Sequence, residues 1–223
     1  MIAWPAWPLP LAAGLLPAAA VLVAWGLSIA AGLVPDCLPW IDGCTSISRA
    51  ARHGHGNVVF KMVVLPCTVL QALHWALARE WLRLRGREGA ATHAILALGL
   101  IAAVALAVYA TYLGTEGRTY GAIRRFGFTT YFGATFVAML LFVRGLLALG
   151  VHRRISRAML AIGLLIVFVG IASVVSGYAV TDDHLRDRLE DLLEWHLAIL
   201  LTGAFVLHAA LYRASGFRLR LYR

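Results

Sequence analysis

The chain has 223 residues, of which 61% are hydrophobic and 14% are charged, and its mean hydropathy is +0.79. A soluble domain is about half apolar and about a quarter charged, so this composition excludes a disordered chain, a fibrous protein and almost every soluble enzyme fold. The net charge of +9 would suggest a nucleic-acid partner in a soluble protein. Here, arginines that hold membrane loops against anionic lipid explain the charge, and no nucleic-acid partner is expected.

Six apolar stretches are long enough to cross a membrane, which requires about 20 mostly apolar residues for a hydrocarbon core about 30 Å thick. They cover approximately residues 9–34, 57–81, 93–113, 126–149, 158–180 and 195–212. We therefore predict an all-α polytopic membrane protein, in which residues 1–223 form one bundle of six transmembrane helices with a small outer cap of loops. The first stretch could instead be a cleaved signal peptide, but its apolar run exceeds the usual length of about 7–15 residues.

The lysines and arginines divide unevenly between the two sides of this predicted topology. One side, with both termini, holds twelve of the 20 basic residues, and the other side holds the remaining eight. Because basic loops stay in the cytoplasm, this distribution predicts that both termini are cytoplasmic.

Three segments on the opposite, outward side hold most of the unusual side chains, and they cover residues 36–57, 114–132 and 181–196. The first contains Cys37 and Cys44, which would face a compartment where oxidation is possible. A disulfide between them would stabilise the loop by about 2.5 kcal/mol on the chain-entropy model. The alternative is a pair of free thiols, with the loop held by packing alone.

Segment 181–196 is predicted to be a helix that continues into the last span, because its leucines recur on one face. Its six acids and two arginines give it a net charge of −4, whereas segment 114–132 has a net charge of +2. We expect the two to dock as an outer cap; two independently solvated loops are the alternative. Glu194 lies at the membrane boundary, where an unpaired carboxylate is costly, so we expect it to pair with Arg124 or Arg125.

Two histidines in the first segment, His53 and His55, are of a type that binds zinc. No second motif with metal-ligand spacing accompanies them, so we expect solvated histidines, no metal ligand and no cofactor. A catalytic serine would need a base beside Ser46 or Ser48, which sequence spacing alone does not show. The sequence contains no nucleophile elbow, phosphate-binding loop, HExxH motif or dinucleotide fingerprint.

Haem held between helices would need two histidines that face each other at matched depth. His74 lies inside the second span, whereas His208 and His196 lie near opposite ends of the last span. This mismatch argues against haem. An ionisable residue inside the membrane is a functional candidate, but the simplest expectation is a neutral His74 hydrogen-bonded to Gln71 or Thr68.

Three stretches carry a resemblance to a known family: GCTSISRAARHGHGNVVFK at 43–61, GTEGRTYGAIRRFGFTTYFGATF at 114–136 and EWHLAILLTGAF at 194–205. They resemble, in order, the loop before span 2, the bacterial span 3–4 loop and the start of the last span in the six-span FRAG/DRAM/SFK family. That family includes the damage-regulated autophagy modulators and membrane proteins of GPI-anchor lipid remodelling.

The resemblance implies a bacterial-type member in the cytoplasmic membrane that acts in membrane lipid remodelling, lipid distribution or the regulation of other membrane proteins. Membrane lipids are its expected partners, with other membrane proteins as a second class. The residues that match the family are Ile47, Ser48, Arg124, Arg125, Gly127, Glu194 and Trp195.

Taken together, the sequence favours a protein without catalytic activity that holds a lipid headgroup in the outer cap. Arginines bind phosphate in a bidentate manner, and aromatic side chains lie at headgroup level. The candidate site residues are Ser46, Ser48, Arg49, Arg118, Arg124, Arg125, Tyr131, Glu194, Trp195 and His196. The alternatives are a membrane-embedded lipid acyltransferase or hydrolase that pairs Ser46 or Ser48 with a histidine, and a haem-binding membrane electron carrier.

Overall fold

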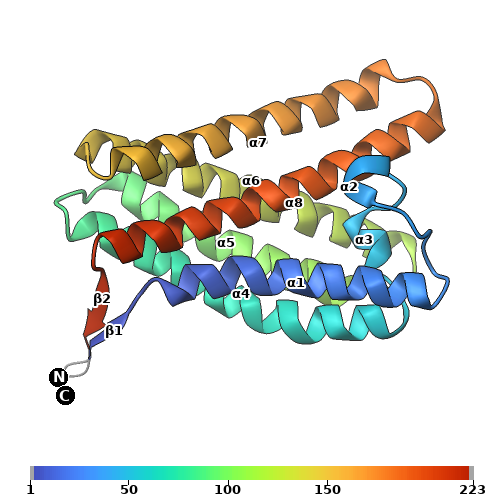
Figure 1. Ribbon diagram of the computed structural model, residues 1–223, viewed down its shortest axis with the longest axis horizontal. Coiled ribbons are helices and arrows are strands. Elements are labelled where there is room, and N and C mark those ends of the chain that lie inside the picture. Colours follow the sequence, from blue (N-terminus) through green and yellow to red (C-terminus); the bar gives the residue numbers. More distant parts are fainter. Residues whose placement is uncertain (1–2, 221–223) are drawn as a thin grey trace.

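The computed structural model describes residues 3–220 and is helical almost throughout (Figure 1). Six helices are long and apolar enough to cross a membrane, which confirms the all-α six-span prediction. The long helices are α1 (Pro8–Ala30), α4 (Gly54–Arg83), α5 (Ala90–Tyr112), α6 (Arg118–Leu149), α7 (Arg153–Ala179) and α8 (Asp183–Ala214). The short elements are α2 (Pro39–Asp42), α3 (Ile47–Ala50), β1 (Ala3–Pro5) and β2 (Arg218–Arg220).

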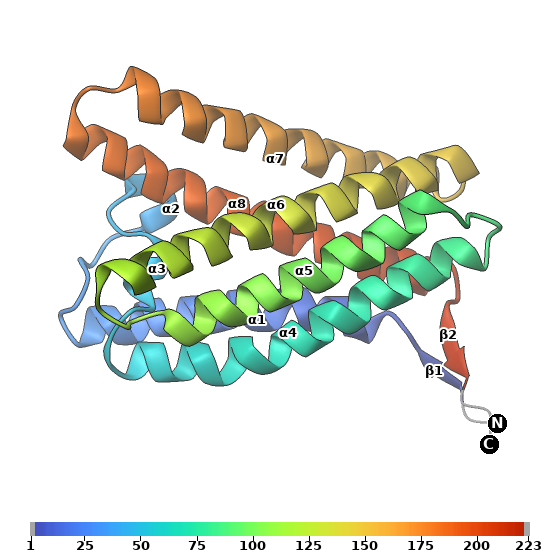
Figure 2. The same cartoon turned by 180° about the vertical axis from the view of Figure 1, so that it is seen from behind.

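The bundle has two different ends, which we call the cap end and the terminal end. Figures 1 and 2 show that α2, α3 and the α7–α8 connection lie at the cap end, whereas β1 and β2 lie at the terminal end. The two strands pair antiparallel, with Trp4 opposite Leu219, and so join the first and last described segments of the chain. Because the number of spans is even, the two strands lie at the same end of the bundle. That this end faces the cytoplasm remains a prediction from the arginine distribution.

Helix α6 begins earlier than the sequence predicted. It starts at Arg118, directly after Gly117, whose φ of 116° is in the region that favours glycine. Residues 118–125 therefore belong to a helix, and our expectation that they form a loop was wrong. The apolar pattern did not reveal this first part of the helix because it contains three arginines.

Helix α8 is continuous from the polar segment into the last span, as predicted. The Asp182 carboxylate caps its N-terminus by accepting hydrogen bonds from the backbone N–H groups of His184 (2.9 Å) and Leu185 (3.2 Å). The apolar run of α8 begins at Trp195, so the charged residues 183–194 form a part of the helix that extends beyond the apolar, membrane-spanning part.

The helices pack closely where small residues face large ones. Gly99 of α5 lies against the Trp75 indole of α4, and an added Cβ there would overlap the ring. A small residue at this position therefore lets α5 and α4 pack closely. Helix α7 differs from the others: it lies along α8 and comes nearest to α6 towards the terminal end (Figure 2), so most of its surface is left for lipid.

Candidate functional site

The first loop folds around the short helix α3 through its serine hydroxyls. Ser46 caps this helix, with its Oγ accepting a hydrogen bond from the Arg49 backbone N–H at 3.1 Å. The Ser46 and Ser48 hydroxyls lie 3.2 Å apart, and the Arg52 Nη2 donates to the Ser48 Oγ at 3.3 Å. Both hydroxyls therefore take part in the local structure of the loop, and no histidine of residues 3–220 is hydrogen-bonded to either one.

The charged part of α8 docks onto this loop. The Arg49 Nη1 lies 3.0 Å from the Asp191 Oδ2, and the Glu194 Oε1 accepts a hydrogen bond from the Ser48 backbone N–H at 3.3 Å. One residue further, the Trp195 Nε1 donates to the Thr45 carbonyl oxygen at 2.8 Å. We call these contacts between α3 and α8 the cap network.

The predicted ion pair between Glu194 and Arg124 or Arg125 is not formed. The ion pairs within residues 3–220 are Arg49–Asp191, Arg83–Glu80 and Arg186–Asp183. Arg124 instead donates to the carbonyl oxygens of Tyr112 and Thr115, at the C-terminal end of α5. Tyr112 is the last residue of α5 and Thr115 lies in the turn that follows it, and the early start of α6 brings Arg124 beside both carbonyls. The acidic segment thus docks on the first outward segment and not on the second.

Burial changes the acidity of two carboxyl groups in the cap network, both of which precede the apolar part of α8. Burial raises the pKa of Asp191 to about 6, although the Arg49 guanidinium opposes the increase. Burial also raises the pKa of Glu194 to about 7, opposed by the Ser48 N–H. Desolvation disfavours the charged form of each group, and this effect outweighs the neighbouring positive charges.

A cavity of about 390 Å³ lies below the cap network, enclosed by α1, α4, α5, α6 and α8. This volume is within the range of about 300–1,000 Å³ that is typical of ligand sites, and its lining is almost entirely apolar. Trp40 and Trp195 line it at the cap end. Leu22 and Ile199 also line it, yet they are 47% and 54% exposed, so the cavity opens sideways to the membrane.

Three tryptophans hold the cap end of this cavity in place. The indole of Trp40 lies 5.4 Å from that of Trp25 and 5.8 Å from that of Trp195, measured between ring centroids. The Trp25–Trp195 separation is 6.4 Å, and all three pairs have edge-to-face geometry, which is favourable for aromatic rings. Helices α1, α2 and α8 are thereby fixed to one another above the cavity.

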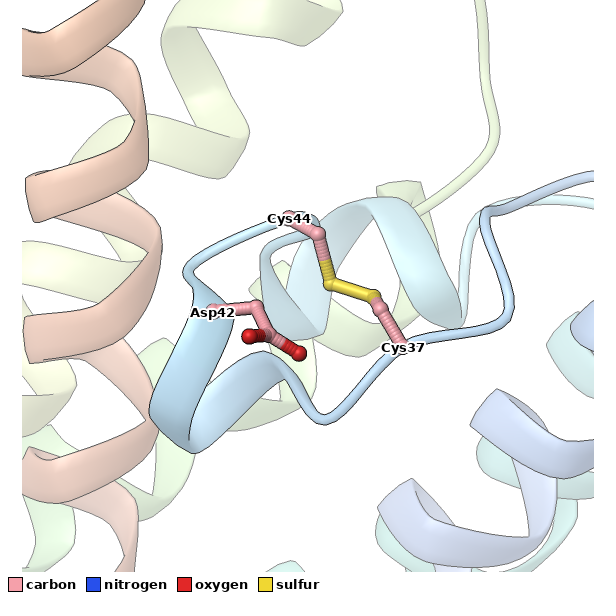
Figure 3. A group of neighbouring side chains, drawn as sticks. All are labelled: Cys37, Asp42 and Cys44. Carbon is pink, nitrogen blue, oxygen red and sulfur yellow. A yellow bond between two sulfur atoms is a disulfide. The ribbon is translucent and has the colours of Figure 1, made fainter.

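Cys37 and Cys44 are joined by a disulfide that spans α2 (Figure 3). The Asp42 carboxylate lies nearby, within 4.8 Å of the two sulfurs, which gives the trio the composition of a metal site. However, the sulfurs are bonded to each other and are not thiolates, the form that binds metal. Asp42 Oδ2 accepts a hydrogen bond from the Leu38 N–H at 2.9 Å, which indicates a structural role for this carboxylate.

His74 does not have the partners that the sequence suggested. Gln71 donates to the Ala13 carbonyl oxygen and to the Tyr131 hydroxyl, and Thr68 donates to a carbonyl of its own helix. His74 instead packs against His208 of α8, with ring centroids 4.7 Å apart and planes at 89°. Because these rings are in contact, a porphyrin cannot fit between them in this arrangement.

The structure brings together about half of the predicted site residues. Ser46, Ser48, Arg49, Glu194 and Trp195 meet in the cap network, whereas Tyr131 lies in the cavity wall. Arg118, Arg125 and His196 are exposed, and the His196 Nδ1 hydrogen-bonds only within its own helix. Sequence reasoning missed the cavity and the histidine pair. An apolar span has the same residue pattern whether or not it lines a cavity. The two histidines of the pair are far apart in the chain, so no local signal links them.

Comparison with known proteins identified no relative of this chain. A scan against protein-family models, a search of curated proteins and a search of solved structures found no match. The six long apolar helices indicate an integral membrane protein with six candidate spans.

Proposed function

We propose that this protein binds a membrane lipid, with an acyl chain in the cavity and the headgroup at the cap end, and acts in lipid remodelling, lipid distribution or regulation. The observation that carries the proposal is the apolar cavity, which is open sideways between exposed Leu22 and Ile199. A lipid can enter such an opening without its acyl chain leaving the membrane. The family resemblance of the three motifs points in the same direction.

The best candidate for binding the headgroup is Arg125. Arg49 and Arg124 are engaged in the cap network and at the end of α5, whereas Arg125 is exposed and forms no ion pair within residues 3–220. It lies three residues before Phe128 and seven before Phe132, both of which line the cavity. This spacing puts the three on one face of α6, with Arg125 nearest the cap end, where its guanidinium can bind a phosphate.

Two adjacent alanines of α1 provide a matched test of the cavity. Ala18 lines it, whereas Ala19 is exposed on the helix surface and does not. Ala18→Phe should fill the cavity and reduce co-purified lipid, measured by native mass spectrometry after extraction in mild detergent. Ala19→Phe adds the same side chain outside the cavity and should retain the lipid. Equal lipid content in the two variants, or wild-type protein without bound lipid, would overturn the proposal.

The headgroup is tested separately with anionic lipid. Arg125→Gln should weaken the retention of phosphatidylglycerol relative to wild type, whereas Arg153→Gln, an exposed arginine at the terminal end, should not. The chemical state of the lipid distinguishes binding from catalysis. Intact diacyl lipid after incubation supports a binding protein, and accumulation of lysolipid or transferred acyl chains would instead support the acyltransferase or hydrolase alternative.

A further inference from the structure

Beyond the lipid cavity, the interior of the bundle contains a series of buried polar groups without partners. Within residues 3–220, the unpaired atoms of this series are the Tyr109 hydroxyl, the Gln71 Oε1, the Thr135 Oγ1, the Trp75 Nε1, both His74 ring nitrogens, the His208 Nε2 and the Tyr212 hydroxyl. Leaving a buried polar group without a hydrogen bond is costly, so such groups are usually paired with protein or with ordered water. Their number in one interior points to bound water.

The histidine pair is the centre of this series. His74 is 0% exposed and His208 is 2% exposed. The His208 Nδ1 lies 2.9 Å from the Ala204 carbonyl oxygen, which can only accept, so Nδ1 carries the proton and Nε2 keeps its lone pair. A neutral His74 offers one donor and one acceptor nitrogen, neither of which is used. The pair can therefore accept a proton on one ring and pass it on through the other.

The polar groups follow one another along the length of the bundle. Towards the cap end, the Tyr131 hydroxyl accepts from the Gln71 amide at 3.2 Å, and Gln71 lies one turn from His74 on α4. Towards the terminal end, the rings of His74 and Tyr212 are 6.1 Å apart. Tyr212 lies one turn before half-buried Ser215, which reaches the terminal surface. The series thus extends from the wall of the large cavity to Tyr212, one turn from the terminal end of the protein.

A small cavity lies next to His208, one of the two histidines. This cavity of about 10 Å³ is lined by His208, Trp75 and Thr135, whose apolar atoms form its walls and whose unpaired polar atoms lie behind them. This volume is about the minimum for one water molecule. Leu201 and Phe205 line both this cavity and the large one, so the two are neighbours.

We propose that His74 and His208 form the midpoint of a hydrated proton relay that runs through the bundle, a function independent of lipid binding. A proton from water adds to the free Nε2 of His208, while its Nδ1–H stays bonded to the Ala204 carbonyl oxygen. The Nε2 proton is then released to water beside His74, which restores the starting tautomer, and His74 takes up and releases a proton at a free nitrogen in the same way. Histidine chains inside membranes serve this purpose. Other titratable side chains along the path are Tyr131 on α6, Tyr109 on α5 and Tyr212 on α8.

The test measures proton flux in liposomes of phosphatidylethanolamine and phosphatidylglycerol that contain the purified full chain and a pH-sensitive dye. A potassium gradient with valinomycin drives the protons. Wild type should acidify the lumen faster than empty liposomes, and His74→Phe and His208→Phe should each lower the flux about tenfold or more. His93→Phe, which changes an exposed histidine of α5, should leave the flux unchanged. Wild-type flux equal to that of empty liposomes, or equal flux in all variants, would overturn the relay.

A measurement on the wild type avoids any dependence on variant folding. Nitrogen-15 labelling of histidine should show the Nδ1–H tautomer for His208, and both buried rings should exchange magnetisation with water. Rings that show no contact with water contradict the proposal. Stoichiometric binding of Zn²⁺ or Cu⁺ that His208→Gln abolishes would also contradict it, since the pair would then be a metal site. His74 and His208 do not line the lipid cavity, so loss of flux in His74→Phe with retained lipid would separate this proposal from the proposed function.

Discussion

The cap network and the buried histidine pair differ in whether their polar groups have hydrogen-bond partners within the protein. In the cap network, Ser48, Arg49 and Glu194 all have partners within the chain. In the interior, His74 has none for either ring nitrogen. Groups that are already hydrogen-bonded hold the structure together, whereas unpaired buried groups remain available to water, a proton or a ligand. In the cap network, residues that stand out in the sequence are thus bonded to one another.

The largest expected effect comes from removing Trp195, because it joins the cap network to the roof of the cavity. Trp195→Ala deletes a side chain that is 3% exposed, together with its hydrogen bond to Thr45. The free energy of unfolding should fall by about 3–5 kcal/mol, as measured by reversible unfolding in mixed micelles. Trp4→Ala, at a position that is 59% exposed, is the control and should have little effect. Similar losses in both variants would remove the distinction between a structural cap and its surroundings.

The next effect is a dependence of stability on pH. Burial raises the pKa of Glu194 from 4.5 in the unfolded chain to about 7. The protonated form is therefore favoured by folding, and this contribution is fully present below pH 4.5 and is lost as the pH rises through about 7. Across that window, the loss should be at most about 3 kcal/mol.

Glu194→Gln isolates this contribution, because glutamine has nearly the same shape and no charge. The variant should be more stable than wild type at pH 8 and show a flatter dependence between pH 5 and pH 8, a window that brackets the raised value. Thermal unfolding at several pH values measures both. If the variant is less stable than wild type at pH 8, the charged form of Glu194 is stabilising and the expected effect of its burial is wrong.

A smaller effect is expected from the disulfide, because it closes only a short loop. Cys37 and Cys44 are seven positions apart, and the chain-entropy model gives about 2.5 kcal/mol for a loop of this size. Replacing both cysteines with serine should lower the free energy of unfolding by no more than this amount. Treatment of wild type with reductant should produce a similar loss, while Cys67→Ser tests whether the buried free thiol contributes separately.

The smallest effect should be an asymmetry between the two partners of the Arg49–Asp191 ion pair. The Asp191 side chain is 8% exposed and that of Arg49 is 47% exposed. Arg49→Gln leaves a buried carboxylate without its guanidinium and should cost about 2 kcal/mol. Asp191→Asn leaves an arginine that can reach water, so it should cost about 1 kcal/mol or less. Comparing the unfolding of both single variants measures the asymmetry, and equal costs would show that Asp191 is not effectively buried.

The sequence predicted the number and type of the long helices because each span contains an apolar run of the length that a bilayer requires. It also predicted the continuity of segment 181–196 with the last span, since the leucines and the capping aspartate are local signals. Local signals failed at α6, where three arginines in 118–125 concealed a helix that begins at a glycine. Helix ends are set by backbone geometry as much as by hydrophobicity.

The contacts of the site depend on which helices become neighbours, and this information is not local. Glu194 was expected to pair with Arg124 or Arg125 because all three lie at one membrane boundary, but equal depth does not imply proximity around a bundle. Likewise, His74 and His208 meet only because α4 and α8 come together in the interior. Their different positions along the apolar runs hid this match, because the helices extend beyond those runs by different lengths.

The pairing of β1 with β2 constrains how the protein is made. These strands, and the packing of α1 against α8, join the first of the six long helices with the sixth. Such contacts between distant parts of a chain form late, because their loop-closure entropy is unfavourable until the intervening segments are ordered. During translation, α1 has inserted long before its partner exists. The cavity, whose wall includes residues of both α1 and α8, is therefore completed only after α8 has been inserted.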